Sequence, residues 1–201
     1  MANIAAALSD RRPPATLGAV PAGTKESAVL AILYEEADET HVVLTRRSPL
    51  MRHHPREMSF PGGRRDPGDA DLRATALRES IEEVALDPAV VEPIGALDSF
   101  VTGGSGLLVT PFVAVAQRRP RLVVASPHEV ESIRHVRLAE LLLDEVWREE
   151  VWPDFRGQGD RAITFFEVVG DTIWGATASM LRQLLATGTG TDGASGAPGL
   201  P

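Results

Sequence analysis

Residues 60–86 read FPGGRRDPGDADLRATALRESIEEVAL and are the most informative stretch of this chain. Because successive helical residues rotate by about 100°, Glu79, Glu82 and Glu83 fall on one narrow sector of a helix that begins after the glycine pair. Like charges at this spacing weaken a helix by roughly 0.2–0.5 kcal/mol per pair, and a cation between the carboxylates removes that repulsion. Oxygen ligands suit Mg²⁺ or Mn²⁺ better than zinc. The pattern therefore predicts a metal-binding helix face, and the alternative is a solvated acidic face.

The same stretch resembles the sequence box of the Nudix hydrolases, G-x5-E-x7-R-E-U-x-E-E-x-G-U. Ser80 stands where that box has an aliphatic residue, and Ala85 stands where it has glycine. The coenzyme A pyrophosphatase subgroup, with a pattern like GGxxDxxDxxxxxTALREAxEE, is matched more closely. The matching residues are Gly62, Gly63, Asp66, Asp69, Thr75, Ala76, Leu77, Arg78, Glu79, Glu82 and Glu83.

A second stretch, just upstream, resembles the signature LLTxRSxxLRxHxGxVxFPGG of the same subgroup. It is matched at Val43, Leu44, Thr45, Arg47, Ser48, Met51, Arg52, His54, Met58 and the run from Phe60 to Gly63. Arg56 stands at the glycine of the signature, so a positive φ there would strain the chain or change the loop. Further matches at Pro111, Glu129 and Trp174 extend the resemblance over residues 27–185.

The resemblance implies an α/β/α sandwich with a mixed central β-sheet and a metal-dependent hydrolase. The expected reaction cleaves the diphosphate bond of coenzyme A (CoA) or its acyl derivatives, giving 4′-phosphopantetheine and adenosine 3′,5′-bisphosphate. Two alternatives stay open: hydrolysis of another nucleoside diphosphate derivative (ADP-ribose, a dinucleotide or a nucleoside triphosphate), and a Nudix-like sensor that binds a nucleotide without cleaving it. The intact carboxylate set argues against the sensor.

Roles for individual residues follow from the resemblance. Glu79 and Glu83 are expected to be the principal metal ligands, and Glu82 a further ligand or a water-positioning group. Arg78 is expected to pair with Glu82 or Asp69 and to hold the loop against the helix. The general base is left open among Glu82, Glu129 and Glu131. The expected substrate-binding residues are Arg47, Arg52, His54, Gly62 and Gly63, and the glycines are expected to let a backbone carbonyl approach the metal.

Charge supports a small phosphate-rich ligand. Residues 46–65 hold six arginines and two histidines against one acid, Glu57. Arginine forks match phosphate oxygens, although arginines can also serve only to keep a loop soluble. The formal net charge of −8 argues against nucleic-acid binding. No apolar run is long enough to cross a membrane, and no signal peptide is evident, so a cytoplasmic location is expected. The absence of cysteine excludes thiolate zinc sites and disulfides, and a homo-oligomer is neither indicated nor excluded.

Composition and periodicity divide the chain into three parts. Residues 1–26 are expected to be a loosely packed lead-in, 27–186 the Nudix hydrolase domain, and 187–201 a disordered Gly/Ala-rich tail. Strands are predicted at residues 27–34, 41–46, 57–60, 91–100, 107–116, 131–137 and 162–169. Helices are predicted after Asp69, which is expected to be the N-cap, and at residues 138–143 and 177–185.

Overall fold

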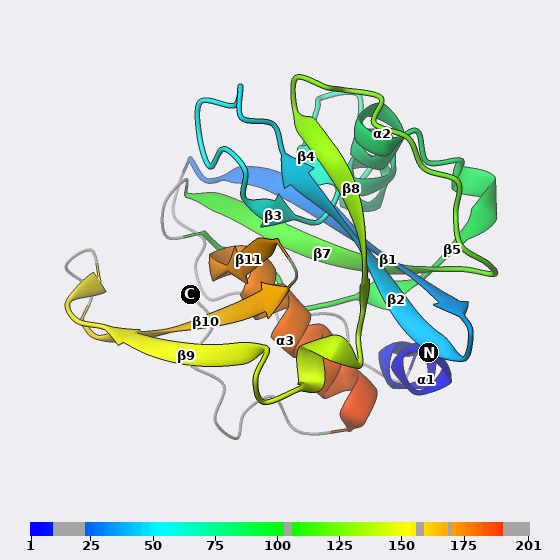
Figure 1. The fold of residues 1–201 in the computed structure, drawn as a ribbon. Coiled ribbons are helices and arrows are strands. Elements are labelled where there is room, and N and C mark those ends of the chain that lie inside the picture. The colour runs from blue at the N-terminus through cyan, green and yellow to red at the C-terminus, as the bar shows by residue number, and fades with distance from the viewer. Residues whose placement is uncertain (10–22, 103–105, 156–158, 169, 191–201) are drawn as a thin grey trace.

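The computed structural model describes residues 1–9, 23–102, 106–155, 159–168 and 170–190. Within them, a large β-sheet lies between helices on its two faces, and a smaller sheet extends from one side (Figure 1). The large sheet holds β1 (Lys25–Glu36), β2 (Glu39–Arg47), β3 (Met58–Ser59), β4 (Gly62–Arg64), β5 (Val91–Ala96), β6 (Phe100–Val101), β7 (Leu107–Ala116) and β8 (Val130–Arg137).

The large sheet is mixed. Its main path runs β3-β2-β1-β7-β5, while β4, β6 and β8 pair with β1, β7 and β2. The central strand β1 is antiparallel to β2 and β4 but parallel to β7. This strand is apolar along most of its length and buried over residues 30–34, as expected of a strand covered on both faces.

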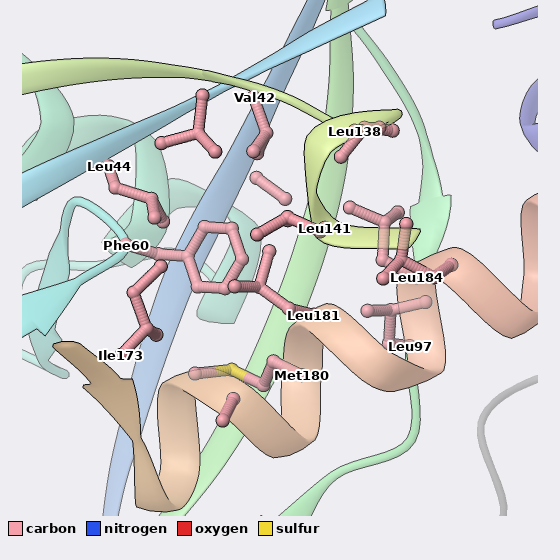
Figure 2. Close-up of a cluster of buried hydrophobic side chains, with 14 of the residues drawn as sticks. Val42, Leu44, Phe60, Leu97, Leu138, Leu141, Ile173, Met180, Leu181 and Leu184 are labelled. Atoms are coloured by element: carbon pink, nitrogen blue, oxygen red, sulfur yellow. The ribbon is translucent and has the colours of Figure 1, made fainter. Parts of the chain in front are cut away.

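Helices cover the two faces of the sheet. Helix α2 (Leu72–Val84) packs on one face, where alternate β1 residues such as Leu30 and Ile32 join Ala76 in a buried cluster. Helices α1 (Ala2–Ser9) and α3 (Gly175–Thr189) cover the other face. Figure 2 shows the core under α3, built from Val42, Leu44, Phe60, Leu97, Leu138, Leu141, Ile173, Met180, Leu181 and Leu184. The arrangement confirms the predicted α/β/α sandwich.

The smaller sheet joins β9 (Trp147–Trp152), β10 (Arg161–Val168) and β11 (Asp171–Trp174) in the order β11-β10-β9. It is antiparallel throughout. The Asp171 carboxylate connects it to the large sheet by ion pairs to Arg46 at 3.2 Å and to Arg134 at 3.1 Å. Strands β9 and β11 were not predicted from the sequence.

Several predicted boundaries are corrected by the structure. Residues 2–9, expected to belong to a loose lead-in, form α1, and its Ile4 and Leu8 side chains are buried. The helix predicted at 138–143 is a single 3₁₀ turn, Glu140–Leu142, and a further 3₁₀ turn lies at Pro88–Val90. Helix α3 runs through Thr189, so the first residues assigned to the disordered tail are helical. The rest of that tail, residues 191–201, lies outside the described residues. No helix in the described part of the chain is long and apolar enough to cross a membrane.

Candidate active site

The loop before α2 is held by a different aspartate from the one predicted to cap the helix. Asp71 is the N-cap: its carboxylate accepts a hydrogen bond from the Ala74 backbone N–H at 2.7 Å. The N-cap prediction for Asp69 was therefore wrong. Asp69 instead accepts hydrogen bonds from the Asp66 backbone N–H (2.9 Å) and the Thr75 hydroxyl (2.8 Å), so it closes the loop onto the helix.

Arg78 joins this loop to the acidic face of α2. Its guanidinium donates to both carboxylate oxygens of Asp69, at 2.9 and 3.1 Å, and to the Arg64 carbonyl at 3.0 Å. It also bonds to Glu82 at 3.0 Å and lies 3.1 Å from Glu79. The hydrogen bonds from Arg78 hold the pKa of Asp69 well below its usual range. Both contacts expected of Arg78, to Asp69 and to Glu82, are present.

Glu79 lies directly over the glycine pair. A Cβ atom on Gly63 would overlap the Glu79 carboxylate, and the carbonyl of Gly63 accepts a 2.6 Å hydrogen bond from the Ser27 hydroxyl. Gly63 thus leaves the space that the Glu79 carboxylate occupies. The predicted approach of a backbone carbonyl to the metal stays a prediction. Gly62, at φ +152°, has no room for a Cβ against the main chain of β1.

Glu83 is buried beside Glu79. Its Oε2 atom accepts a hydrogen bond from the Gly62 backbone N–H at 3.1 Å. Burial raises the pKa of Glu83 to about 8, and the negative charges of Glu79 and Glu129 add to the rise, while the Gly62 bond and the charge of Arg47 oppose it. The charges of Glu79, Glu129 and Arg47 therefore all act on the Glu83 carboxylate.

Glu129 reaches this position through the loop that follows β7. The loop folds over the end of α2, where the Ala125 backbone N–H donates to the Glu83 carbonyl at 3.0 Å. Glu129 then bonds through its carbonyl to the Ser48 N–H at 2.8 Å, next to Arg47 at the end of β2. Residues far apart in sequence are thereby brought to one edge of the sheet.

The other two candidates for the general base are engaged by arginines. Glu82 is 55% exposed and engaged by Arg78. Glu131 forms an ion pair with Arg46 at 3.2 Å, on the side of the sheet that faces the smaller sheet. Of the three candidates, Glu129 is the one whose charge acts on both Glu79 and Glu83.

The loop between β2 and β3 carries the predicted substrate-binding residues. The Nε atom of Arg47 is buried and has no hydrogen-bond partner in the part of the chain that the structure describes. Arg52 is exposed, and His54, at φ +55°, contacts the Glu57 carboxylate at 2.9 Å. Arg56 adopts φ +62°, so the left-handed conformation considered for this position is present with arginine in place.

Two of the departures from the Nudix box, Ser80 and Ala85, have local explanations. Ser80 is fully buried, and its hydroxyl donates to the Ala76 carbonyl one turn back at 2.7 Å, so it needs no other partner. Ala85 adopts the left-handed conformation (φ +53°) that ends the helix, with its N–H bonded to the Ile81 carbonyl. Glycine is usual in that conformation because it has no Cβ.

The carboxylates of this site fit a hard divalent cation. Burial raises the pKa of Glu79 as well as that of Glu83, and the charge of Glu79 raises the pKa of Glu83 further. A divalent ion beside them would favour their ionised forms. Among the described residues, no three Asp, Glu or His side chains already stand as a metal cluster. The fit therefore rests on Glu79 and Glu83, with Glu82 turned towards Arg78.

Comparison with known proteins agrees with this geometry. The NUDIX domain family model matches residues 24–155. An uncharacterized Nudix hydrolase, NudL, of Klebsiella pneumoniae (strain 342) is 37% identical over 161 residues, 80% of this chain and 81% of the relative. NudL of Photorhabdus laumondii is 40% identical over 145 residues, 71% of this chain and 74% of the relative. Nudix hydrolase 22 (chloroplastic) of Arabidopsis thaliana is 35% identical over 162 residues, 78% of this chain and 53% of the relative.

The fold also has a counterpart among solved structures. A NUDIX hydrolase from Alicyclobacillus acidocaldarius superposes with a TM-score of 0.51 at 18% identity, covering 81% of this chain and 91% of that one. The fold and the acidic helix thus define a pyrophosphohydrolase. The chain belongs to the Nudix family.

Proposed function

We propose that this Nudix hydrolase cleaves the diphosphate bond of CoA or of acyl-CoA, giving (acyl-)4′-phosphopantetheine and adenosine 3′,5′-bisphosphate. The broader activity, hydrolysis of a nucleoside diphosphate derivative, accords with its family and relatives. The narrower substrate rests on the two stretches that resemble the CoA pyrophosphatase subgroup, residues 43–63 and 62–83.

One observation carries the proposal: the two stretches meet at Glu83. The glycine pair of the first stretch donates a hydrogen bond to Glu83 through Gly62. Arg47, from the same stretch, acts on the Glu83 carboxylate with its positive charge. Arg47 is only partly buried, and its guanidinium can offer charge-assisted hydrogen bonds to diphosphate oxygens. The residues of the signature thus support one site.

In this site Glu79 and Glu83 would hold Mg²⁺ or Mn²⁺. Such an ion, when bound, neutralises diphosphate oxygens and lowers the pKa of a bound water. The chain does the rest: Arg47 binds the diphosphate, and Arg78 fixes the loop through Asp69 and so orients Glu79. Gly63 leaves the space that the Glu79 carboxylate occupies.

Glu129 is assigned as the general base. Its charge acts on both Glu79 and Glu83, and the Ser48–Glu129 backbone bond holds its main chain at the site. A base within hydrogen-bond reach of the attacking water contributes about 10²–10⁴-fold to the rate. Glu129→Gln should therefore lower kcat by about that factor while metal affinity stays close to that of wild type.

The substrate is tested by parallel turnover assays with CoA, an acyl-CoA, ADP-ribose and NADH in excess Mg²⁺. The proposal expects the highest kcat/KM on CoA or acyl-CoA, with the products identified by mass. A higher kcat/KM on ADP-ribose or NADH would move the assignment to another nucleoside diphosphate derivative. Binding of these ligands without turnover of any of them would identify a nucleotide sensor.

A further inference from the structure

Arg56 occupies a backbone conformation that an arginine adopts only at a cost. Its φ of +62° lies in the left-handed region, where a Cβ atom crowds the main chain and glycine is favoured. The Arg56 side chain is exposed, so burial in the protein core does not offset that cost. A strained residue that persists in a loop beside a site points to a role for its side chain.

The strained loop is held firmly in place. The Arg56 backbone N–H donates to the Arg47 carbonyl at 3.1 Å, and the Arg47 N–H donates to the Glu57 carbonyl at 2.9 Å. His54, itself at φ +55°, contacts the Glu57 carboxylate at 2.9 Å. The main chain of Arg56 is therefore fixed against Arg47, which adjoins Glu83.

The charge of Arg56 is uncompensated. Of the arginines in the basic stretch, Arg46 and Arg65 form ion pairs with acids. Arg52 and Arg56 form none within the described residues, and the acid of their own loop, Glu57, is engaged by His54. The guanidinium of Arg56 is thus available to an anion that comes from outside the chain.

We propose that Arg56 binds an anionic group of the substrate that lies beyond the scissile diphosphate. Arg47 is partly buried and its charge acts on Glu83, so it takes the diphosphate, whereas Arg56 lies beside it through its backbone bond to Arg47 and is exposed. This assignment rests on the proposed function, under which the outer anion is the 3′-phosphate of CoA. Arg56 then determines specificity for the phosphorylated ribose.

The test uses two ligands that differ only in this phosphate, adenosine 3′,5′-bisphosphate and AMP. Their dissociation constants are measured by calorimetry in Mg²⁺ for wild type, Arg56→Gly, Arg56→Ala and Arg56→Lys. Arg118→Ala is the control, since Arg118 is an exposed arginine beyond the end of β7 with no ion pair in the described part of the chain. Glycine removes both charge and strain, alanine removes the charge alone, and lysine keeps the charge.

The expected result separates charge from backbone. Arg56→Gly and Arg56→Ala should weaken bisphosphate binding by about 5- to 10-fold and AMP binding by less than about 2-fold, because one charge-assisted contact is lost. Arg56→Lys should retain most of the affinity, and Arg118→Ala all of it. Arg56→Gly should also unfold at a higher temperature than Arg56→Ala, because it relieves the left-handed strain.

Three outcomes would overturn the assignment: unchanged bisphosphate affinity in Arg56→Gly and Arg56→Ala, an equal loss for both ligands, or no preference of wild type for the bisphosphate. The proposed function is judged separately, by the products of CoA turnover. If CoA is turned over but the Arg56 variants bind the bisphosphate as tightly as wild type, only the role of Arg56 is rejected. A phosphate preference that depends on Arg56, without CoA turnover, would reject only the proposed reaction.

Discussion

At the scale of single residues, the departures from the family pattern lie at positions with a special backbone conformation or a buried polar group. Ala85 and Arg56 both keep a left-handed backbone with a side chain in place of glycine. Ser80 replaces an aliphatic residue and satisfies its hydroxyl within the helix. The substitutions are visible in the sequence, but the backbone angle that each must adopt is not, because φ at a helix end depends on the packing of the next segment.

Replacing Ala85 by glycine should stabilise the protein. The left-handed conformation costs an L-residue roughly 1–2 kcal/mol, and glycine avoids this cost. Part of the resulting stabilisation is lost because glycine raises the conformational entropy of the unfolded chain. We expect the free energy of unfolding to rise by up to about 1 kcal/mol in denaturant titrations. Ala74→Gly, inside α2, is the matched control and should lose about 1 kcal/mol. Equal losses in both variants would show that Ala85 is not strained.

Replacing Glu83 by glutamine should stabilise the metal-free protein in a pH-dependent way. The folded pKa of about 8 lies above the ordinary value, so Glu83 favours folding at low pH, and this contribution is lost as pH rises towards 8. Glutamine keeps an acceptor for the Gly62 N–H and removes the charge. Without metal, we expect the free energy of unfolding of Glu83→Gln to equal that of wild type at pH 4. At pH 8 it should exceed that of wild type by a few kcal/mol, since one pKa unit is worth about 1.4 kcal/mol.

Turnover gives the second measurement on the same variant. Glu83→Gln should lose most activity in Mg²⁺, because it loses a proposed ligand charge. Full activity, or a metal-free protein that is less stable than wild type at pH 8, would contradict the account of Glu83. Glu82→Gln serves as the comparison, because Glu82 is largely exposed and paired with Arg78.

At the scale of elements, the sequence predicts those whose pattern is strong and local. Helix α2 and strands β1, β2, β7 and β10 were predicted because they are apolar at a regular period. Strand β9 is not predicted by the sequence, since half of its residues are charged, most are exposed, and they pair only at the edge of a small sheet. Helix α1 is not predicted, because residues 1–26 are rich in alanine, glycine and proline, which indicates a loosely packed segment. The spacing of Ile4 and Leu8, one helical turn apart, is the signal for the helix.

The sequence names the residues of the candidate site but does not give their arrangement. The carboxylates of α2 and the Arg47 stretch follow from the motif. Glu129 precedes β8, and the pairing of β8 with β2 shifts register at Glu131, between the Val130–Arg47 and Ser132–Arg46 pairs. Regular strand alternation would put two residues at this spacing on one face, so the choice of Glu129 over Glu131 does not follow from the sequence pattern. Likewise Asp69 and Asp71 both precede α2. Asp69 is distinguished by its hydrogen bond from Arg78, whereas Asp71 caps the helix by accepting a hydrogen bond from the Ala74 N–H.

Asp69→Asn tests the clamp between the loop and α2. Because the folded pKa of Asp69 is depressed, its contribution to stability is present at neutral pH and is lost as pH falls below the ordinary range of an aspartate. The free energy of unfolding of the variant should be lower than that of wild type at pH 7. It should also fall less than that of wild type as the pH is lowered below about 5. Asp66→Asn, at an exposed position in the same loop, is the control. If the free energy of unfolding of wild type and of Asp69→Asn fell in parallel with decreasing pH, the stabilising role of the Asp69–Arg78 contact would be contradicted.

At the scale of the whole molecule, the N-terminal helix closes one face of the sandwich. Helix α1 packs against α3, where Gly188 leaves room for Ile4: a Cβ on that glycine would lie 2.8 Å from the Ile4 side chain. The glycine that suggested a disordered tail is thus part of a helix contact. Composition alone did not reveal it, because a small residue at a close helix crossing looks the same in sequence as a flexible one.

Ile4→Ala should measure this packing. Ile4 is 5% exposed, and deletion of a buried isoleucine side chain down to alanine costs roughly 2–5 kcal/mol. We expect a loss near the lower end, about 2 kcal/mol, because α1 lies at the periphery of the core. The exposed Asn3→Ala is the control and should change little. A loss below about 0.5 kcal/mol, typical of surface substitutions, would show that α1 is not docked in solution.

The central claim is that the edge formed by Arg47, Gly63, Glu79, Glu83 and Glu129 hydrolyses the diphosphate of CoA with a divalent ion. The most direct measurement is the ³¹P spectrum of CoA incubated with the enzyme, once with Mg²⁺ and once with a chelator. The account predicts that the diphosphate signals disappear with Mg²⁺ and are replaced by phosphomonoesters of 4′-phosphopantetheine and adenosine 3′,5′-bisphosphate, while the chelated sample stays unchanged. Persistent diphosphate signals in excess Mg²⁺ and Mn²⁺, or equal loss with the chelator, would contradict it.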